Sequence, residues 1–123
     1  MPTSKDILDK ADKTLKSNQI VPMVYNDAAK QGEQDIAAYG KARAELSTSI
    51  NSMKGLCEGA DSKLKALNAG LSELKKNEAV MKAPADAAKY KKLVADYTAE
   101  IKEGMELDKK LTAVYTKATQ MFK

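Results

Sequence analysis

The chain has 123 residues, of which 43% are hydrophobic and 31% are charged, a composition that indicates one soluble folded domain rather than a disordered segment. It has no histidine and a single cysteine, which excludes a Ser-His-Asp triad, a histidine-dependent diiron site and an intrachain disulfide. Arg43 is the only arginine among 21 basic residues in a chain of net charge +4, which argues against sequence-specific nucleic-acid binding because base contacts favour arginine.

The first predicted element is a short amphipathic helix over residues 4–17. The segment Thr3–Asp6 supplies an N-cap candidate and an acidic residue for the first turn. A helix this short is marginal alone, so we expect it to dock on another element. The apolar residues that share one face are Ile7, Leu8, Ala11 and Leu15.

The start of the chain lacks the apolar core of a signal peptide, and no apolar run approaches the roughly 20 residues that span a bilayer. The single cysteine fits a reducing compartment. We therefore expect a cytoplasmic protein, although export without a cleaved signal, or a signal already removed, stays open.

The second predicted element is a long helix over residues 22–82, for which Pro22 suits the first position. Apolar residues recur there in alternating steps of four and three, which is the pattern of a packed helical seam. Gly55 and Gly59 each weaken a helix. Because the seam keeps its phase across them, we favour a continuous or kinked helix over a turn. The seam residues are Leu46, Ile50, Met53, Cys57, Ala60, Leu64, Leu67, Leu71 and Leu74.

The last predicted helix covers residues 85–122 and follows a turn around Pro84. It has an apolar seam of its own. A second apolar row lies beside this seam, and Asp108 is the only polar residue in that second row. A face this broad contacts two neighbours rather than one. The residues of the second row are Val94, Ile101, Tyr115 and Phe122.

These elements predict an all-α fold in a single domain over residues 1–123: an elongated antiparallel helical bundle or coiled-coil hairpin, with three main helices plus a short N-terminal helix. The short turn around Pro84 folds the last helix back on the long one. Either residues 4–35 or a second copy of the chain then covers the broad face of the last helix.

No catalytic, metal or cofactor site is predicted from the residue types. Cys57 falls at a seam position, where a buried structural thiol is the expected role. Glu100, Glu103 and Glu106 lie close together on one helix, where pairing with neighbouring lysines is the ordinary interpretation.

We therefore expect a non-enzymatic helical protein–protein interaction module: a coiled-coil subunit, an adaptor or a small chaperone. Its partner is another protein or a second copy of itself. The candidate contact residues are Val94, Ile101, Tyr115 and Phe122. On this hypothesis, Ile101→Asp abolishes assembly and leaves the helical hairpin formed. The alternative is an amphipathic bundle that binds a lipid or membrane surface.

The order Tyr90, Tyr97-Thr98 and Gln120-Met121-Phe122 after a proline-containing turn resembles the second helix of type III secretion needle subunits, at a handful of positions. This chain is longer than those subunits. The resemblance implies a third function, as a component or chaperone of a secretion or filament apparatus.

Overall fold

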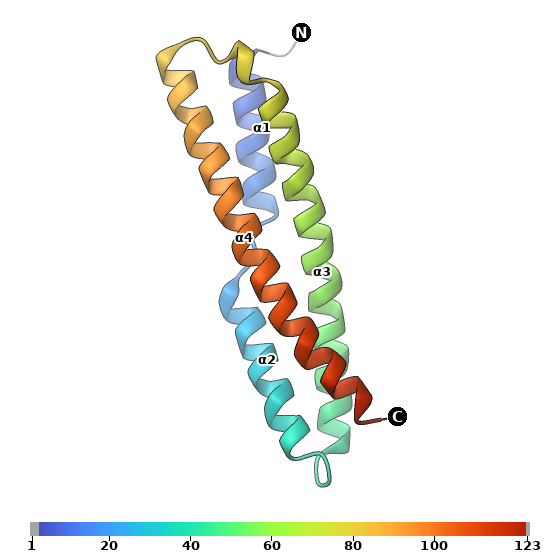
Figure 1. The fold of residues 1–123 in the computed structure, drawn as a ribbon. Helices are drawn as coiled ribbons and strands as arrows, with labels where there is room; N and C mark the ends of the chain where they lie inside the picture. The colour runs from blue at the N-terminus through green and yellow to red at the C-terminus, as the bar shows by residue number, and fades with distance from the viewer. Residues whose placement is uncertain (1–2, 123) are drawn as a thin grey trace. The chain divides into compact units, whose positions relative to one another are not determined.

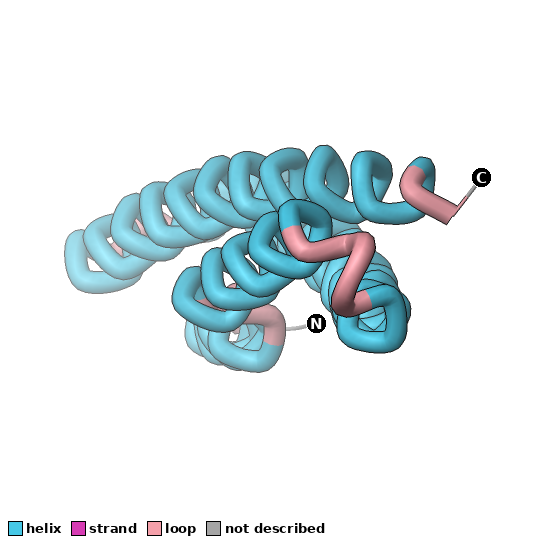
Figure 2. Tube along the Cα trace, turned by 90° about the horizontal axis from the view of Figure 1, so that it is seen from below, coloured by secondary structure: helices cyan, strands magenta, loops and turns pink. Residues whose placement is uncertain are grey.

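The computed structural model describes residues 3–122, and these residues form helices joined by turns, with no strand among them (Figures 1 and 2). The predicted all-α helical bundle is confirmed. Within the same residues, no helix combines the length and the apolar character that crossing a membrane requires. The elements are α1 (Ser4–Ser17), α2 (Pro22–Ala37), α3 (Arg43–Lys76), the 3₁₀ turn η1 (Glu78–Val80) and α4 (Pro84–Gln120).

The chain groups into two compact units. Unit 1 combines Met1–Ile20 with Lys63–Glu103, and unit 2 combines Val21–Ser62 with Gly104–Lys123. Unit 1 therefore contains α1, and unit 2 contains α2. Helices α3 and α4 are divided between the two units. The single-domain assignment stays a prediction.

In unit 1, α1 begins with a capping box. The Thr3 hydroxyl accepts a hydrogen bond from the Asp6 backbone N–H, and the Asp6 carboxylate accepts one from the Thr3 N–H, at 3.2 Å each. The apolar face of α1 then buries Leu8, Ala11 and Leu15 against α3 and α4. The N-terminal helix of the chain thus covers the last helix in this unit.

Tyr97 joins the three helices of unit 1. Its side chain is fully buried, and its hydroxyl donates a 2.6 Å hydrogen bond to the backbone carbonyl of Ala11 in α1. The ring lies against Gly70 of α3, where a Cβ atom would stand 2.8 Å from the tyrosine oxygen. Gly70 is therefore the residue that lets α3 and α4 approach so closely.

In unit 2, α2 packs on α3 and α4 through small residues. A Cβ atom at Gly32 would lie 2.9 Å from the Met53 side chain and 3.0 Å from Val114. The buried Asp35 of α2 accepts hydrogen bonds from the Ser49 hydroxyl of α3 and, at 3.1 Å, from the Gln31 amide. Among the described residues, no buried side-chain nitrogen or oxygen lacks a partner.

The predicted seam of α3 is confirmed. The burial of its residues alternates along the helix. Every seventh residue is almost completely buried, at 0–1% exposure, whereas Ile50, Cys57, Leu64 and Leu71 between them are half-buried. The helix also runs unbroken through Gly55 and Gly59, where an added Cβ atom would meet nothing within 4 Å. The fully buried row consists of Leu46, Met53, Ala60, Leu67 and Leu74.

The prediction of one helix over 22–82 is wrong at two places. α2 ends at Ala37, a turn follows, and α3 begins at Arg43 and ends at Lys76. Folding back at this turn buries Tyr25, Ala29 and Gly32 of α2 within the chain, which a straight helix would leave exposed. Gly40 in the turn lowers the cost of interrupting the helix, since glycine is a poor helix former.

Candidate interaction surface

The four contact residues predicted from the sequence do not form one exposed surface. Ile101 is 9% exposed and belongs to the core of unit 1, and Val94 packs half-buried against the same core. Tyr115 of unit 2 is half-buried, and Phe122 is 41% exposed. Ile101 is covered by its own chain and is therefore not available to a partner in the folded protein.

Phe122 is held by residues of its own unit. Its ring meets the Tyr39 ring edge-on, with centroids 5.4 Å apart and planes at 88°. The Arg43 guanidinium lies 5.4 Å from the Tyr39 centroid and 5.6 Å from the Phe122 centroid. Both distances lie within the range of a cation–π contact.

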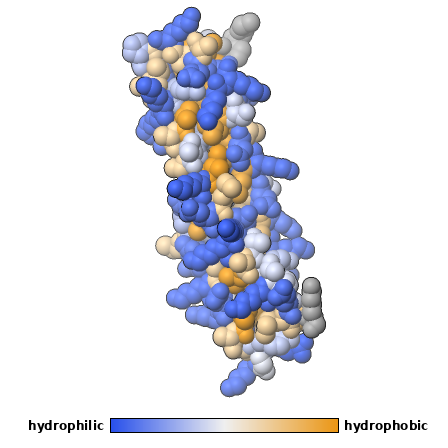
Figure 3. Space-filling model, viewed as in Figure 1, coloured by the Kyte–Doolittle hydropathy of each residue, from blue (hydrophilic) through white to orange (hydrophobic). Residues whose placement is uncertain are grey.

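Large apolar side chains are exposed where α2 begins. Val21 is 53% exposed, Met23 71% and Val24 46%. Val21 occupies the N-cap of α2, and its side chain makes no capping hydrogen bond. On the face shown in Figure 3, hydrophilic residues predominate and hydrophobic ones show between them.

A cleft of about 360 Å³ lies between α2 and α4 in unit 2. Its middle is apolar, formed by Ala29, Ala113 and Val114, and its borders carry charged or amide side chains. The Lys110 ammonium group donates a 3.4 Å hydrogen bond to the Asn26 side-chain oxygen across the cleft. The full lining is Asn26, Ala29, Lys30, Glu33, Lys110, Ala113, Val114 and Lys117.

Met23 extends this cleft along α2. It precedes Asn26 by three residues and Lys30 by seven, the spacing that places side chains on one side of a helix. We call Met23 and the cleft lining together the α2–α4 face. It combines the most exposed of the large hydrophobic side chains with three lysines.

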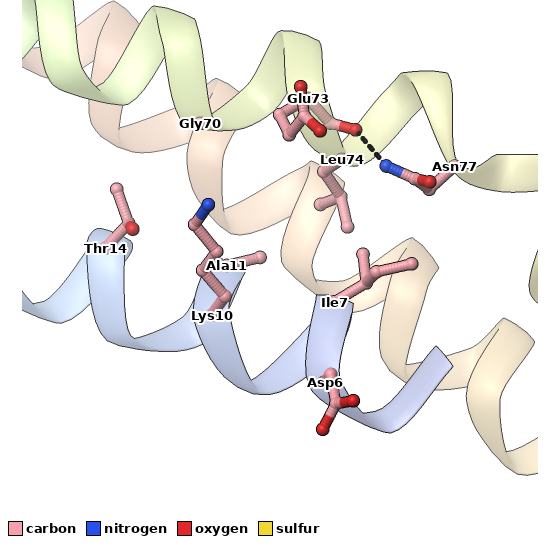
Figure 4. A pocket seen from close by; sticks show the side chains of 9 residues that line it. All are labelled: Asp6, Ile7, Lys10, Ala11, Thr14, Gly70, Glu73, Leu74 and Asn77. Carbon is pink, nitrogen blue, oxygen red and sulfur yellow. Dashed lines mark hydrogen bonds between the residues drawn. The ribbon is translucent and has the colours of Figure 1, made fainter. Parts of the chain in front are cut away.

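A second, smaller cavity of about 220 Å³ lies between α1 and α3 in unit 1 (Figure 4). Ala11 and Gly70 are small enough to leave this space open. The Asn77 amide donates a 2.8 Å hydrogen bond to the backbone carbonyl of Glu73 at its edge. Asp6, Lys10 and Glu73 give its rim charges of both signs, so it has no clear preference for a charged ligand. Its complete lining is Asp6, Ile7, Lys10, Ala11, Thr14, Gly70, Glu73, Leu74 and Asn77.

Five polar side chains gather where the helices of unit 2 meet. The Thr112 hydroxyl donates to Asp108 at 3.4 Å and lies 3.5 Å from the Cys57 sulfur. Burial raises the pKa of Asp108, and the nearby Asp61 carboxylate raises it further. Burial also raises the pKa of Cys57 and that of Tyr25. A raised pKa lowers the thiolate fraction of Cys57 and therefore its strength as a nucleophile.

Asp108→Asn is expected to stabilise the folded chain near pH 7 and to leave its stability near pH 3 unchanged. Because the folded-state pKa of Asp108 is raised above the unfolded value of about 3.9, the folded state loses stability as the pH rises between these two values. Asparagine removes the charge and keeps an oxygen for Thr112. Urea unfolding followed by circular dichroism at both pH values measures the effect.

Asp27→Asn, at an exposed carboxylate of α2, is the matched control for this experiment. If the pKa of Asp108 is raised in the folded state, only Asp108→Asn should gain folding stability near pH 7. An equal gain in the control, or a gain for Asp108→Asn that does not change with pH, would contradict it.

Among the residues that the structure describes, no group of three or more Cys, Asp or Glu side chains is placed to hold a metal ion. No protein-family model, no curated protein and no solved structure matches the chain. Its function must be argued from its own residues, and the α2–α4 face is the surface with the most distinctive chemistry.

Proposed function

We propose that this chain is a non-enzymatic helical protein–protein interaction module that binds another protein through the α2–α4 face. The observation that carries the proposal is the 71% exposure of Met23 on the side of α2 that also carries Asn26 and Lys30 of the α2–α4 cleft. Covering the Met23 side chain with a partner is favourable by about 25 cal/mol per Å² of apolar surface removed from water.

The residue types support a binding role over a catalytic one. The sequence has no histidine, which is the commonest general acid–base, and burial raises the pKa of its single thiol, which makes that thiol a poorer nucleophile. A role as adaptor, assembly subunit or small chaperone follows from the same proposal. A cytoplasmic location is part of it, supported by a lone cysteine that fits a reducing compartment.

Photocrosslinking tests the proposal. A photoreactive amino acid replaces Met23 in cells that make the protein, and the same residue replaces Val80 as a control. Both side chains are exposed, at 71% and 49%, but Val80 lies in η1 of unit 1. We expect a discrete heavier adduct from position 23 and none from position 80. Circular dichroism confirms that both variants fold.

The mass of the adduct distinguishes a second copy of the chain from a different protein. Equal adducts at both positions, or none at either, would contradict the proposal. Co-sedimentation of the wild-type chain with anionic vesicles that Met23→Asp abolishes, in the absence of any adduct, would instead favour the lipid-binding alternative.

A further inference from the structure

We infer that the α2–α4 cleft binds an acidic, amphipathic helical segment of the partner protein. The inference rests on the proposed function and adds the chemistry of the partner. Two observations carry it: the charge of the cleft borders and the apolar strip between them.

The lining of the cleft has a net positive charge. Lys30, Lys110 and Lys117 are exposed and outnumber the one acidic side chain of the lining, Glu33. Within residues 3–122, the ion pairs join other lysines, and none of these three lysines forms one. The hydrogen bond of Lys110 is made to Asn26, a neutral amide. Carboxylates from a partner would supply the missing charge.

The spacing of the lysines suits a helix. Lys110 and Lys117 lie two turns apart on α4, or about 10.5 Å at a rise of 1.5 Å per residue. Carboxylates seven residues apart on a second helix have the same separation. Ala29 and Ala113 between the lysine borders are small, so apolar side chains of that helix can enter the cleft.

The same features favour an acidic protein segment over nucleic acid or a membrane surface. All three cations are lysines, whereas phosphate and base recognition favours the planar fork of arginine. The apolar floor of the cleft, formed by Ala29, Ala113 and Val114, and the exposed Met23 beside it favour a ligand with apolar groups between its negative ones. An amphipathic helix rich in glutamate and leucine offers both on one face.

The probe for this inference is a fluorescein-labelled helical peptide of glutamate, alanine and leucine, with glutamates seven residues apart. Fluorescence anisotropy measures its binding to the full chain. Lys30→Glu/Lys110→Glu/Lys117→Glu is expected to weaken binding by about tenfold or more, because three favourable charge pairs become repulsive. The matching Gln triple variant removes the charges without repulsion and should give a smaller loss.

Lys13→Glu/Lys65→Glu/Lys91→Glu is the control. It changes the net charge equally, at exposed lysines of unit 1 that form no ion pair within residues 3–122. Binding within about twofold of wild type in this control supports the inference. Equal losses in both Glu triple variants would reveal general charge attraction and overturn it.

Absence of peptide binding to the wild-type chain would also overturn the inference. The inference would also be overturned if the three lysines bound single-stranded DNA or anionic vesicles instead of the peptide. An adduct at position 23 would still support the proposed function in either case, so the two failures are distinguishable.

Discussion

Replacing Tyr97 with alanine is expected to lower the free energy of unfolding by about 3–5 kcal/mol, the range for truncating a large buried aromatic residue. The ring is fully buried in unit 1 and packs against Gly70, and its hydroxyl bonds to the Ala11 carbonyl. Alanine would leave a cavity among α1, α3 and α4. Urea unfolding followed by circular dichroism measures the loss.

Phenylalanine at the same position separates the hydrogen bond from the packing. Tyr97→Phe is expected to cost about 1 kcal/mol, since it removes only the bond to the Ala11 carbonyl. Tyr90→Phe is the control, because the Tyr90 ring is also buried in unit 1 and its hydroxyl bonds to no other residue within 3–122. Equal costs for the two phenylalanine variants would show that the bond to α1 contributes no stability.

Ile101→Asp is expected to destabilise the folded chain by more than about 3 kcal/mol, because it removes a buried aliphatic group and places a carboxylate in the core. This differs from the expectation drawn from the sequence, in which the variant stays folded and loses only assembly. Thermal unfolding followed by circular dichroism distinguishes the two outcomes.

Met105→Asp is the matched control for that variant. It lies four residues further along α4, and its side chain is 58% exposed, so its effect should stay within about 0.5 kcal/mol. A folded, stable Ile101→Asp protein would show that this position is not buried in solution.

The core of the chain was predictable because its apolar spacing is regular. The seam from Leu46 to Leu74 identified the buried face of α3, and its unbroken phase correctly indicated a continuous helix at Gly55 and Gly59. The turn between α2 and α3 could not be found this way. Ile36 and Tyr39 fall in the same phase as the seam beyond them, so the interruption leaves no mark in the pattern.

The candidate surface was harder to predict than the core. The broad apolar row of α4 indicates that Ile101 is covered, but the pattern alone cannot decide whether residues 4–35 or a second copy of the chain covers it. Lys30 and Lys117 look like ordinary solvated residues until α2 is folded beside α4. The one local signal was the sequence Val21-Pro22-Met23-Val24, whose hydrophobic residues fall outside the buried positions of α2.

The buried carboxylate of Asp35 restricts the position that α2 can take along its axis. Tyr25 is the one large apolar side chain that α2 buries, and Ala29 and Gly32 beyond it are small, so the buried polar contact of Asp35 adds a second restraint against sliding along the helix axis. A slide by one turn would take Asp35 away from Ser49 and leave its charge buried without that donor. Asp35 therefore penalises misaligned arrangements of α2 and selects the one in which Lys30 faces the cleft.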